Sequence, residues 1–269
     1  MFALIAEMLS YGFLVRALAA GILISLCAAL LGVTLVLKRA SMIGDGLAHV
    51  GFGALTVAAA MNVAPLIVSV PVVLMCAVLL LRLSEHSAIR GDSAIGLIST
   101  SALAIGVLVS SLAGSNVDVN SYMFGSILAM DTADVYLAAG LSATVGILFL
   151  ILYDQIFAVT FDENFARATG TNVEAYNLVI ALLTAVTIVV GMRMMGTLLI
   201  SSLIIFPALT SMRVFKRFFS VVISSAVVSV VCFLVGMVAS YAWSLPTGAS
   251  VVAANMICFC LFTFIGWKR

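Results

Sequence analysis

Nine apolar stretches, each near the length that crosses a bilayer as an α-helix, follow one another along this chain. They hold more apolar side chain than a soluble fold can bury, because 64% of the residues are hydrophobic and 9% are charged, whereas soluble domains carry roughly 25% charged residues. None alternates as a barrel strand does, and backbone groups in lipid must find partners within a helix. We therefore predict a single all-α polytopic membrane domain over residues 1–269. The stretches are 13–37, 44–61, 65–83, 93–113, 132–153, 177–194, 197–212, 221–243 and 247–267.

Basic residues between the stretches predict which ends face the cytoplasm, where Lys and Arg concentrate. The connection 114–131 carries two aspartates and no basic residue, so it is predicted to lie outside. A literal count gives nine crossings with the N-terminus outside. Arg193, between Gly191 and Gly196, argues against two separate full spans there and favours a broken or half-length helix. The basic groups are Lys38 with Arg39, Arg82 with Arg90, Arg213 with Lys216 and Arg217, and Lys268 with Arg269.

Asp45 and His49 stand in the densest polar cluster beside an apolar run. Their i,i+4 spacing puts both on one face of a helix, one turn apart. An aspartate near the middle of a span costs about 2.5–3.5 kcal/mol on insertion scales, so it is usually kept for a pathway or a partner. Carboxylate oxygen with imidazole nitrogen suits Zn²⁺, Mn²⁺ or Fe²⁺. Two ligands are too few for one ion, so a homodimer or water would complete the shell.

This pair also has a purely structural interpretation. Asp45 could cap a helix after the turn 38–41, and His49 could hydrogen-bond to a neighbouring carbonyl group. Glycines at 44, 46, 51 and 53 remove side-chain bulk around the pair, which permits close helix packing or an open path. On spacing alone both interpretations stand.

The longest polar segment within the array runs over residues 154–176. Asp162 is suited to cap a short helix there and Gly170 to end it, and the charge pattern places this amphipathic helix on the cytoplasmic side. Phe161, Phe165 and Ala168 would lie on one side of it. The spacing fits a solvated connecting helix and a docking helix for a cytoplasmic partner equally well.

Sequence patterns typical of nucleotide-binding proteins and of hydrolases are missing. The sequence has no GxxxxGK[ST] nucleotide loop, no HExxH pattern and no GxSxG nucleophile pattern. Its net charge of +1 leaves no basic face for nucleic acid, which is therefore not expected as a partner.

Several segments, in the correct order, resemble the permeases of ATP-binding-cassette importers for zinc, manganese and iron. Residues 36–49, VLKRASMIGDGLAH, resemble the hallmark segment of that family, and residues 91–96, GDSAIG, its loop into the mid-chain span. Residues 162–170, here called the coupling segment, are similar to its cytoplasmic coupling segment. Residues 195–208, MGTLLISSLIIFPA, look like its late helix, and residues 245–249, LPTGA, like the start of its last span. The resemblance covers essentially the whole chain.

The resemblance implies a homodimer of the cobalamin-type (type II) importer permease architecture, with about eight spans (seven to nine) and both termini inside. It implies metal ligands at Asp45 and His49, although the family often has Ser or Thr where this hallmark reads Gly46-Leu47-Ala48. No permanently bound cofactor is expected; the cargo would be Zn²⁺, Mn²⁺ or Fe²⁺, with zinc slightly favoured by the hallmark and late-helix segments.

The same resemblance implies partners in the cytoplasmic (inner) membrane: two cytoplasmic ATP-binding subunits, which would hydrolyse the ATP, and an extracytoplasmic metal-binding protein. The residues predicted to meet the ATPase are Asp162, Glu163, Phe165, Ala166, Arg167 and Gly170. The alternatives are a stand-alone secondary metal transporter, a metal-dependent membrane enzyme and a non-transporting scaffold.

Overall fold

The computed structural model describes residues 7–86, 91–113, 125 and 130–267. Within these residues, nine α-helices are long and apolar enough to cross a membrane. They are α2 (Gly12–Leu37), α3 (Met42–Ala60), α4 (Pro65–His86), α5 (Gly91–Leu112), α7 (Thr132–Ile151), α10 (Val173–Met195), α11 (Thr197–Val214), α12 (Phe218–Trp243) and α13 (Thr247–Trp267). Two short helices, α8 (Tyr153–Phe161) and α9 (Glu163–Ala168), lie between α7 and α10.

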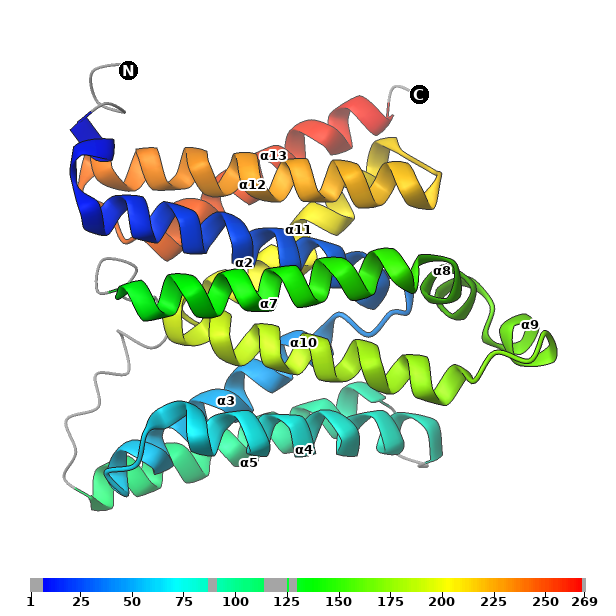
Figure 1. Cartoon of the computed structure of the whole chain (residues 1–269), viewed down its shortest axis with the longest axis horizontal. Helices are drawn as coiled ribbons and strands as arrows, with labels where there is room; N and C mark the ends of the chain where they lie inside the picture. Colours follow the sequence, from blue (N-terminus) through cyan, green and yellow to red (C-terminus); the bar gives the residue numbers. More distant parts are fainter. Residues whose placement is uncertain (1–6, 87–90, 114–124, 126–129, 268–269) are drawn as a thin grey trace.

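Each predicted apolar stretch forms one helix, which confirms the all-α polytopic fold. The number of candidate spans is nine in the described residues, the upper end of the expected range and the same as the count from charges. In Figure 1, α2 begins at the end of the bundle opposite to that at which α13 finishes, as an odd number of crossings requires. The described helices therefore do not fit the expectation of both chain ends on one side. The connection predicted to lie outside, 114–131, falls largely outside the described residues.

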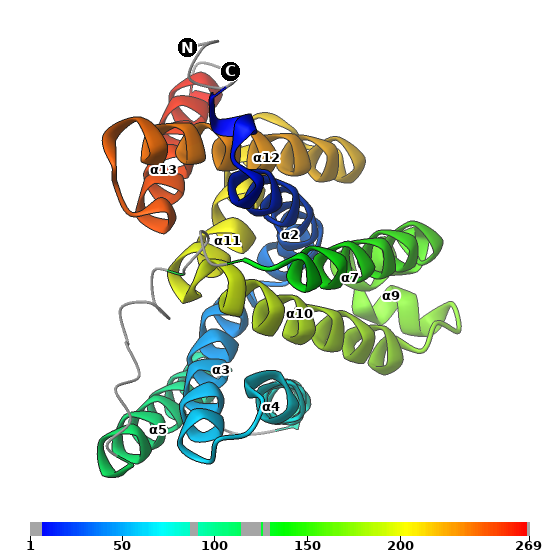
Figure 2. The ribbon, with the colours of Figure 1, turned by 60° about the vertical axis from the view of Figure 1, so that its left-hand side comes forward.

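Four helices bury most of their apolar windows within the protomer. More than half of each apolar window in α2, α3, α10 and α11 is buried, whereas less than a quarter is buried in α4, α5, α7 and α13. Figure 2 shows α2, α10 and α11 in the middle, with α3, α4 and α5 on one side and α12 with α13 on the other. The outer helices present most of their apolar surface outward, as helices in contact with lipid or with a membrane partner do.

Glycine residues, which have no side chain beyond hydrogen, let the backbones of α3 and α5 touch. A β-carbon on Gly53 in α3 would lie 2.4 Å from the Ala102 carbonyl oxygen in α5, and one on Gly106 would lie 2.7 Å from Gly53 Cα. Helices in membranes associate through such small residues, because lipid supplies no hydrophobic force between them. This contact fixes how α3 is rotated in the bundle.

The prediction that residues 177–194 and 197–212 are not two separate spans is wrong. α10 and α11 are two separate helices that meet at Gly196 alone, whose φ of +87° is a left-handed value that glycine adopts without steric cost. Gly191 stays helical, and a β-carbon on it would lie 2.6 Å from Ile200 Cδ1 of α11. Gly191 therefore serves close packing between the two helices and does not interrupt α10.

Arg193 is held at the end of α10 by an aspartate of α7. Its guanidinium lies 3.3 Å from Asp134 Oδ1. The other oxygen of that carboxylate accepts a hydrogen bond from the Asp131 backbone N–H, and the Asp131 side chain accepts one in return from the Asp134 backbone, which together form a capping box. The arginine is also favourable at this position because the last turn of a helix attracts positive charge.

We expect Asp134→Ala to lower the stability of the folded protein by about 1–2 kcal/mol, since one substitution removes half of a capping box and an ion pair. The measurement is the melting temperature of the purified protein in detergent. Asp154→Ala is the matched control, because Asp154 stands in the first turn of α8 and is exposed. Equal melting temperatures for the two variants would contradict a stabilising role for Asp134.

The sequence did not reveal α8, because Asp154 and Gln155 placed its residues in the polar segment. Tyr153, Phe157 and Phe161 recur every four residues on one face of this helix, and all three rings lie 5.4–5.9 Å from the ring of Phe218 at the start of α12. Such offset and edge-on arrangements are favourable for aromatic pairs. The aromatic contacts hold α8 against the bundle and thereby place the coupling segment.

Candidate functional site

The polar pair is carried by α3, which begins inside the bundle and not at its end. The connection from α2 turns back inward, as Figure 1 shows. A β-carbon on Gly44, in the first turn of α3, would lie 3.3 Å from Ile204 Cδ1 and 4.0 Å from Ile188 Cδ1. Ile204 is near the middle of α11. The first turn of α3 therefore lies at mid-depth of the bundle.

Asp45 and His49 stand one turn apart on α3, as their spacing predicts. His49 Nε2 and Asp45 Oδ2 are 3.6 Å apart, and the side chains are 35% and 43% exposed, respectively. The head groups thus converge without forming a short hydrogen bond, and both are accessible on the same side.

Neighbouring glycines show which face of α3 the pair occupies. A β-carbon on Gly46 would lie 2.5 Å from Ile95 of α5, and Gly53 likewise faces α5, while Gly44 faces α10 and α11. Because successive residues are about 100° apart on a helix, Asp45 and His49 lie on the face between these two contacts. Their partial exposure means that the protomer leaves this face open.

The structural interpretation of the pair is not supported. The N-cap of α3 is Ser41, and in the part of the chain that the structure describes neither Asp45 nor His49 hydrogen-bonds to a backbone group. No group of three or more His, Cys, Asp or Glu side chains there could hold a metal ion. One protomer therefore offers two candidate metal ligands at this level, as the sequence indicates.

The coupling segment has the predicted ends. Asp162 Oδ1 accepts a hydrogen bond of 2.9 Å from the Phe165 backbone and so caps α9. Gly170 has a φ of +85°, and its N–H donates to the Arg167 carbonyl group, which ends the turn. Phe165 and Arg167 are exposed. In Figure 1, α8 and α9 project at the end of the bundle where α2 and α11 finish.

Ala166 does not fit the predicted contact set. Its side chain is fully buried against Val159 and Val173, so it anchors the coupling segment to α8 and α10 and cannot face a partner. A six-residue helix must bury one side to be ordered, since isolated short helices are marginal in water.

Glu163 also faces the bundle. Its Oε1 accepts a hydrogen bond of 2.8 Å from Lys38 Nζ, at the end of α2, and one of 3.2 Å from Asn177 Nδ2 in α10. Partial burial raises the pKa of Glu163, but the hydrogen bond and charge of Lys38, with smaller contributions from Asn177 and Arg167, lower it overall. Because a lowered pKa favours the carboxylate, this ion pair persists at neutral pH. Its contribution to stability is lost only as the pH falls through the lowered value.

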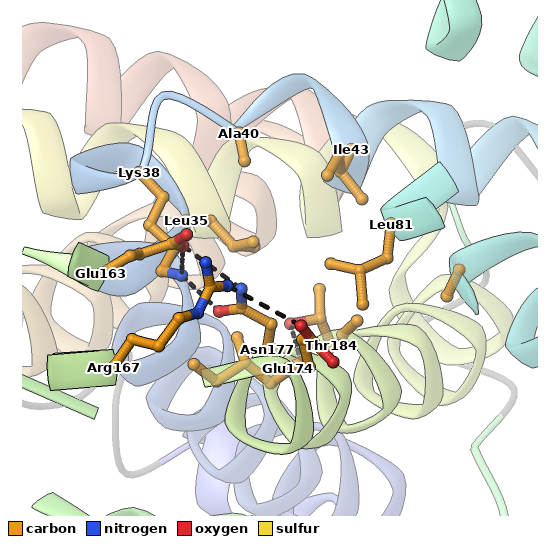
Figure 3. A pocket seen from close by; sticks show the side chains of 13 residues that line it. Leu35, Lys38, Ala40, Ile43, Leu81, Glu163, Arg167, Glu174, Asn177 and Thr184 are labelled. Carbon is orange, nitrogen blue, oxygen red and sulfur yellow. Dashed lines mark hydrogen bonds and ion pairs between the residues drawn. The ribbon is translucent and has the colours of Figure 1, made fainter. Parts of the chain in front are cut away.

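A cavity of about 530 Å³ lies beside this cluster (Figure 3). Two basic and two acidic side chains line its polar wall, together with Asn177 and Thr184. Ile43 also lines it, and Asp45, two residues further on, points about 200° away around α3. The cavity and the Asp45–His49 pair are therefore on different faces of the same helix. The charged residues of the wall are Lys38, Arg167, Glu163 and Glu174.

Sequence reasoning missed Lys38 and Asn177 as members of this cluster. In the sequence, Lys38 is an orientation charge within the hallmark segment and Asn177 begins an apolar stretch, and neither pattern pairs the two residues. The available signal was their polarity at the borders of two spans, where a buried charge or amide needs a partner.

The model of the family described as "ABC 3 transport family" matches residues 10–266. The chain belongs to this family. The match spans nearly the whole sequence and confirms the resemblance that the motifs indicate. A member is the membrane permease and does not itself hydrolyse ATP, and the protein is a multi-pass membrane protein.

Two relatives differ in the metal that their names give. The manganese transport system membrane protein MntC of Halalkalibacterium halodurans is 27% identical over 264 residues, which cover 98% of this chain and 90% of the relative. The high-affinity zinc uptake system membrane protein ZnuB of Haemophilus influenzae is 30% identical over 250 residues, which cover 92% of this chain and 95% of the relative.

Solved structures share the fold. PsaBC from Streptococcus pneumoniae, determined in complex with Fab, superposes with a TM-score of 0.88 at 27% identity and covers 98% of this chain and 96% of that one. An inward-facing transporter described as of the metal-chelate ABC type superposes with a TM-score of 0.77 at 15% identity, over 94% of this chain and 86% of that one. The second likeness concerns the fold alone, and it agrees with the expected type II importer architecture.

Proposed function

We propose that this protein is the permease subunit of an ATP-driven importer for divalent transition-metal ions, with Zn²⁺ as the expected cargo. The observation that carries the proposal is the Asp45–His49 pair at mid-depth of the bundle, on a face that the protomer leaves open. Oxygen and nitrogen ligands of this kind suit Zn²⁺, Mn²⁺ and Fe²⁺, and the names of the relatives include manganese and zinc.

The open face supports a homodimer. A carboxylate facing lipid at mid-depth costs about 2.5–3.5 kcal/mol on insertion scales, and a second copy of the chain would cover it. Two protomers would bring two aspartates and two histidines to a common axis, enough ligands for one ion. A shell shared between subunits can be weakened when they move apart, as release of a transported ion requires.

The partners in this proposal follow from family membership and from the exposed coupling segment. An extracytoplasmic metal-binding protein would deliver the ion to the outer mouth of the path. Two cytoplasmic ATP-binding subunits would dock at Phe165 and Arg167, and their closure would rock the protomers so that the ion passes Asp45 and His49. This chain would supply the path and the selectivity.

The decisive experiment is metal uptake into cells that lack the native importer and express the complete system. We expect accumulation of ⁶⁵Zn²⁺ to depend on this chain and unlabelled Zn²⁺ to compete best. Stronger competition by Mn²⁺ or Fe²⁺ would identify that ion as the cargo and would leave the proposed importer function unchanged. Uptake that persists after the ATPase subunit is deleted would contradict ATP-driven import and would favour a stand-alone secondary transporter.

A further inference from the structure

Lys38 joins three elements that are distant in the sequence (Figure 3). It is the C-cap residue of α2, and its side chain is 16% exposed. Its ammonium group donates to Glu163 of the coupling segment at 2.8 Å and to Asn177 Oδ1 of α10. Asn177 Nδ2 in turn donates to Glu163. Each pair of these three residues is hydrogen-bonded, so the coupling segment is tied to α2 and α10 at one point.

Lys38 stands directly before the connection that leads to Asp45 and His49 on α3. Residues 38–41 form a tight turn in which the Ala40 N–H donates to Leu35 at 2.8 Å, and the Gly44 N–H of α3 donates to Ser41 at 3.2 Å. Arg39 holds a left-handed φ of +57°, which non-glycine residues rarely adopt. A connection this short and this hydrogen-bonded passes a displacement of Lys38 on to the first turn of α3, where Asp45 lies.

The surroundings permit such a displacement. The cavity of about 530 Å³ beside the cluster separates the coupling segment from α4, whose Ala77 and Leu81 form the opposite wall. Apart from the Lys38 cluster and the Arg167–Glu174 pair, α9 is anchored by the small buried side chain of Ala166. Movement of α9 therefore meets the cavity on one side and is passed to α2 through Lys38.

We propose that the Lys38–Glu163–Asn177 cluster is the link through which the coupling segment moves the α2–α3 connection and so repositions Asp45 and His49. Lys38 and Glu163 are positioning residues and touch no cargo. This inference rests on the proposed function, because it concerns how ATP hydrolysis in a partner would reach the metal pair.

A second ion pair in the same region provides a matched control. Arg167 and Glu174 lie 3.8 Å apart, are 61% and 74% exposed, and connect α9 to α10 without involving α2. Glu174→Gln removes one negative charge, as Glu163→Gln does, but leaves the route to α3 intact. An exposed pair of this kind contributes little to stability.

The test uses the complete importer, with its ATP-binding subunits and binding protein, reconstituted in liposomes. Uptake of Zn²⁺ and of Mn²⁺ and the rate of ATP hydrolysis are measured for Lys38→Met, Glu163→Gln, the exchanged pair Lys38→Glu with Glu163→Lys, and the control Glu174→Gln. We expect Lys38→Met and Glu163→Gln each to lower metal transported per ATP by at least about tenfold, the loss expected from a charge-assisted hydrogen bond, and Glu174→Gln to leave it unchanged. ATP hydrolysis should stay near the wild-type rate, and the exchanged pair should recover transport.

Glu163→Gln keeps the shape of the side chain and removes its charge, so it separates a lost link from failed assembly. Unchanged transport per ATP in Lys38→Met and Glu163→Gln would overturn the link. So would an equal loss in Glu174→Gln, since the effect would then be a general one of charge. A wild-type complex that transports neither metal would refute the proposed function itself and is distinguishable from both outcomes.

Discussion

Asp45→Ala and His49→Ala should each abolish metal uptake while the protein still folds and assembles. Each substitution removes one of the two candidate ligands that a protomer contributes, and in a homodimer it removes them in pairs. Changes in the second shell of metal sites already cost roughly 10- to 100-fold, so loss of direct ligands should lower uptake by more than about 100-fold. The measurement is ⁶⁵Zn²⁺ accumulation in cells that express the complete importer.

Assembly decides how that result is interpreted. Both side chains are partly exposed and make no hydrogen bond to the backbone in the described residues, so neither substitution should unfold α3. Co-purification of the ATPase subunit with each variant checks this. Met61→Ala is the control, because Met61 is exposed at the opposite end of α3. Normal uptake by both variants would show that Asp45 and His49 are not ligands on the transport path.

Gly53→Ala is expected to be the most disruptive single methyl addition in α3. The new β-carbon would lie 2.4 Å from the Ala102 carbonyl oxygen and 2.9 Å from its carbon, a distance that requires the two helix backbones to separate. Overpacking of this kind typically costs about 1–3 kcal/mol. We expect a lower melting temperature in detergent and reduced uptake, because α3 carries Asp45 and His49.

Gly96→Ala in α5 is the matched control for that substitution. Among the described residues, no atom beyond the neighbouring turns of α5 lies within 4 Å of a β-carbon built on Gly96. Alanine is favoured over glycine in a helix by up to about 1 kcal/mol. Gly96→Ala should therefore be neutral or slightly stabilising. If Gly53→Ala behaved in the same way, close contact between α3 and α5 could not be what fixes the rotation of α3.

Features that depend on neighbouring residues could be predicted from the sequence. The coupling segment begins at Asp162 and ends at Gly170 as predicted, because capping and left-handed turns involve residues within one turn of each other. Asp45 and His49 converge for the same reason. Arg193 was misjudged, because its partner, Asp134, is on another helix. Ala166 was assigned to the partner surface, because burial of a short helix depends on what packs against it.

The sequence by itself determined that this protein crosses the membrane many times, where each membrane-spanning helix lies, and that Asp45 faces the same way as His49. Lipid enforces the first two, since backbone groups there must bond within the helix, and helical periodicity gives the third. Only the tertiary structure decided that the pair lies at mid-depth and that Lys38 meets Glu163, a residue 125 positions away. Those contacts depend on how closely helices distant in the sequence approach one another. That approach is set by the packing of small residues such as Gly44 and Gly53, which no local pattern encodes.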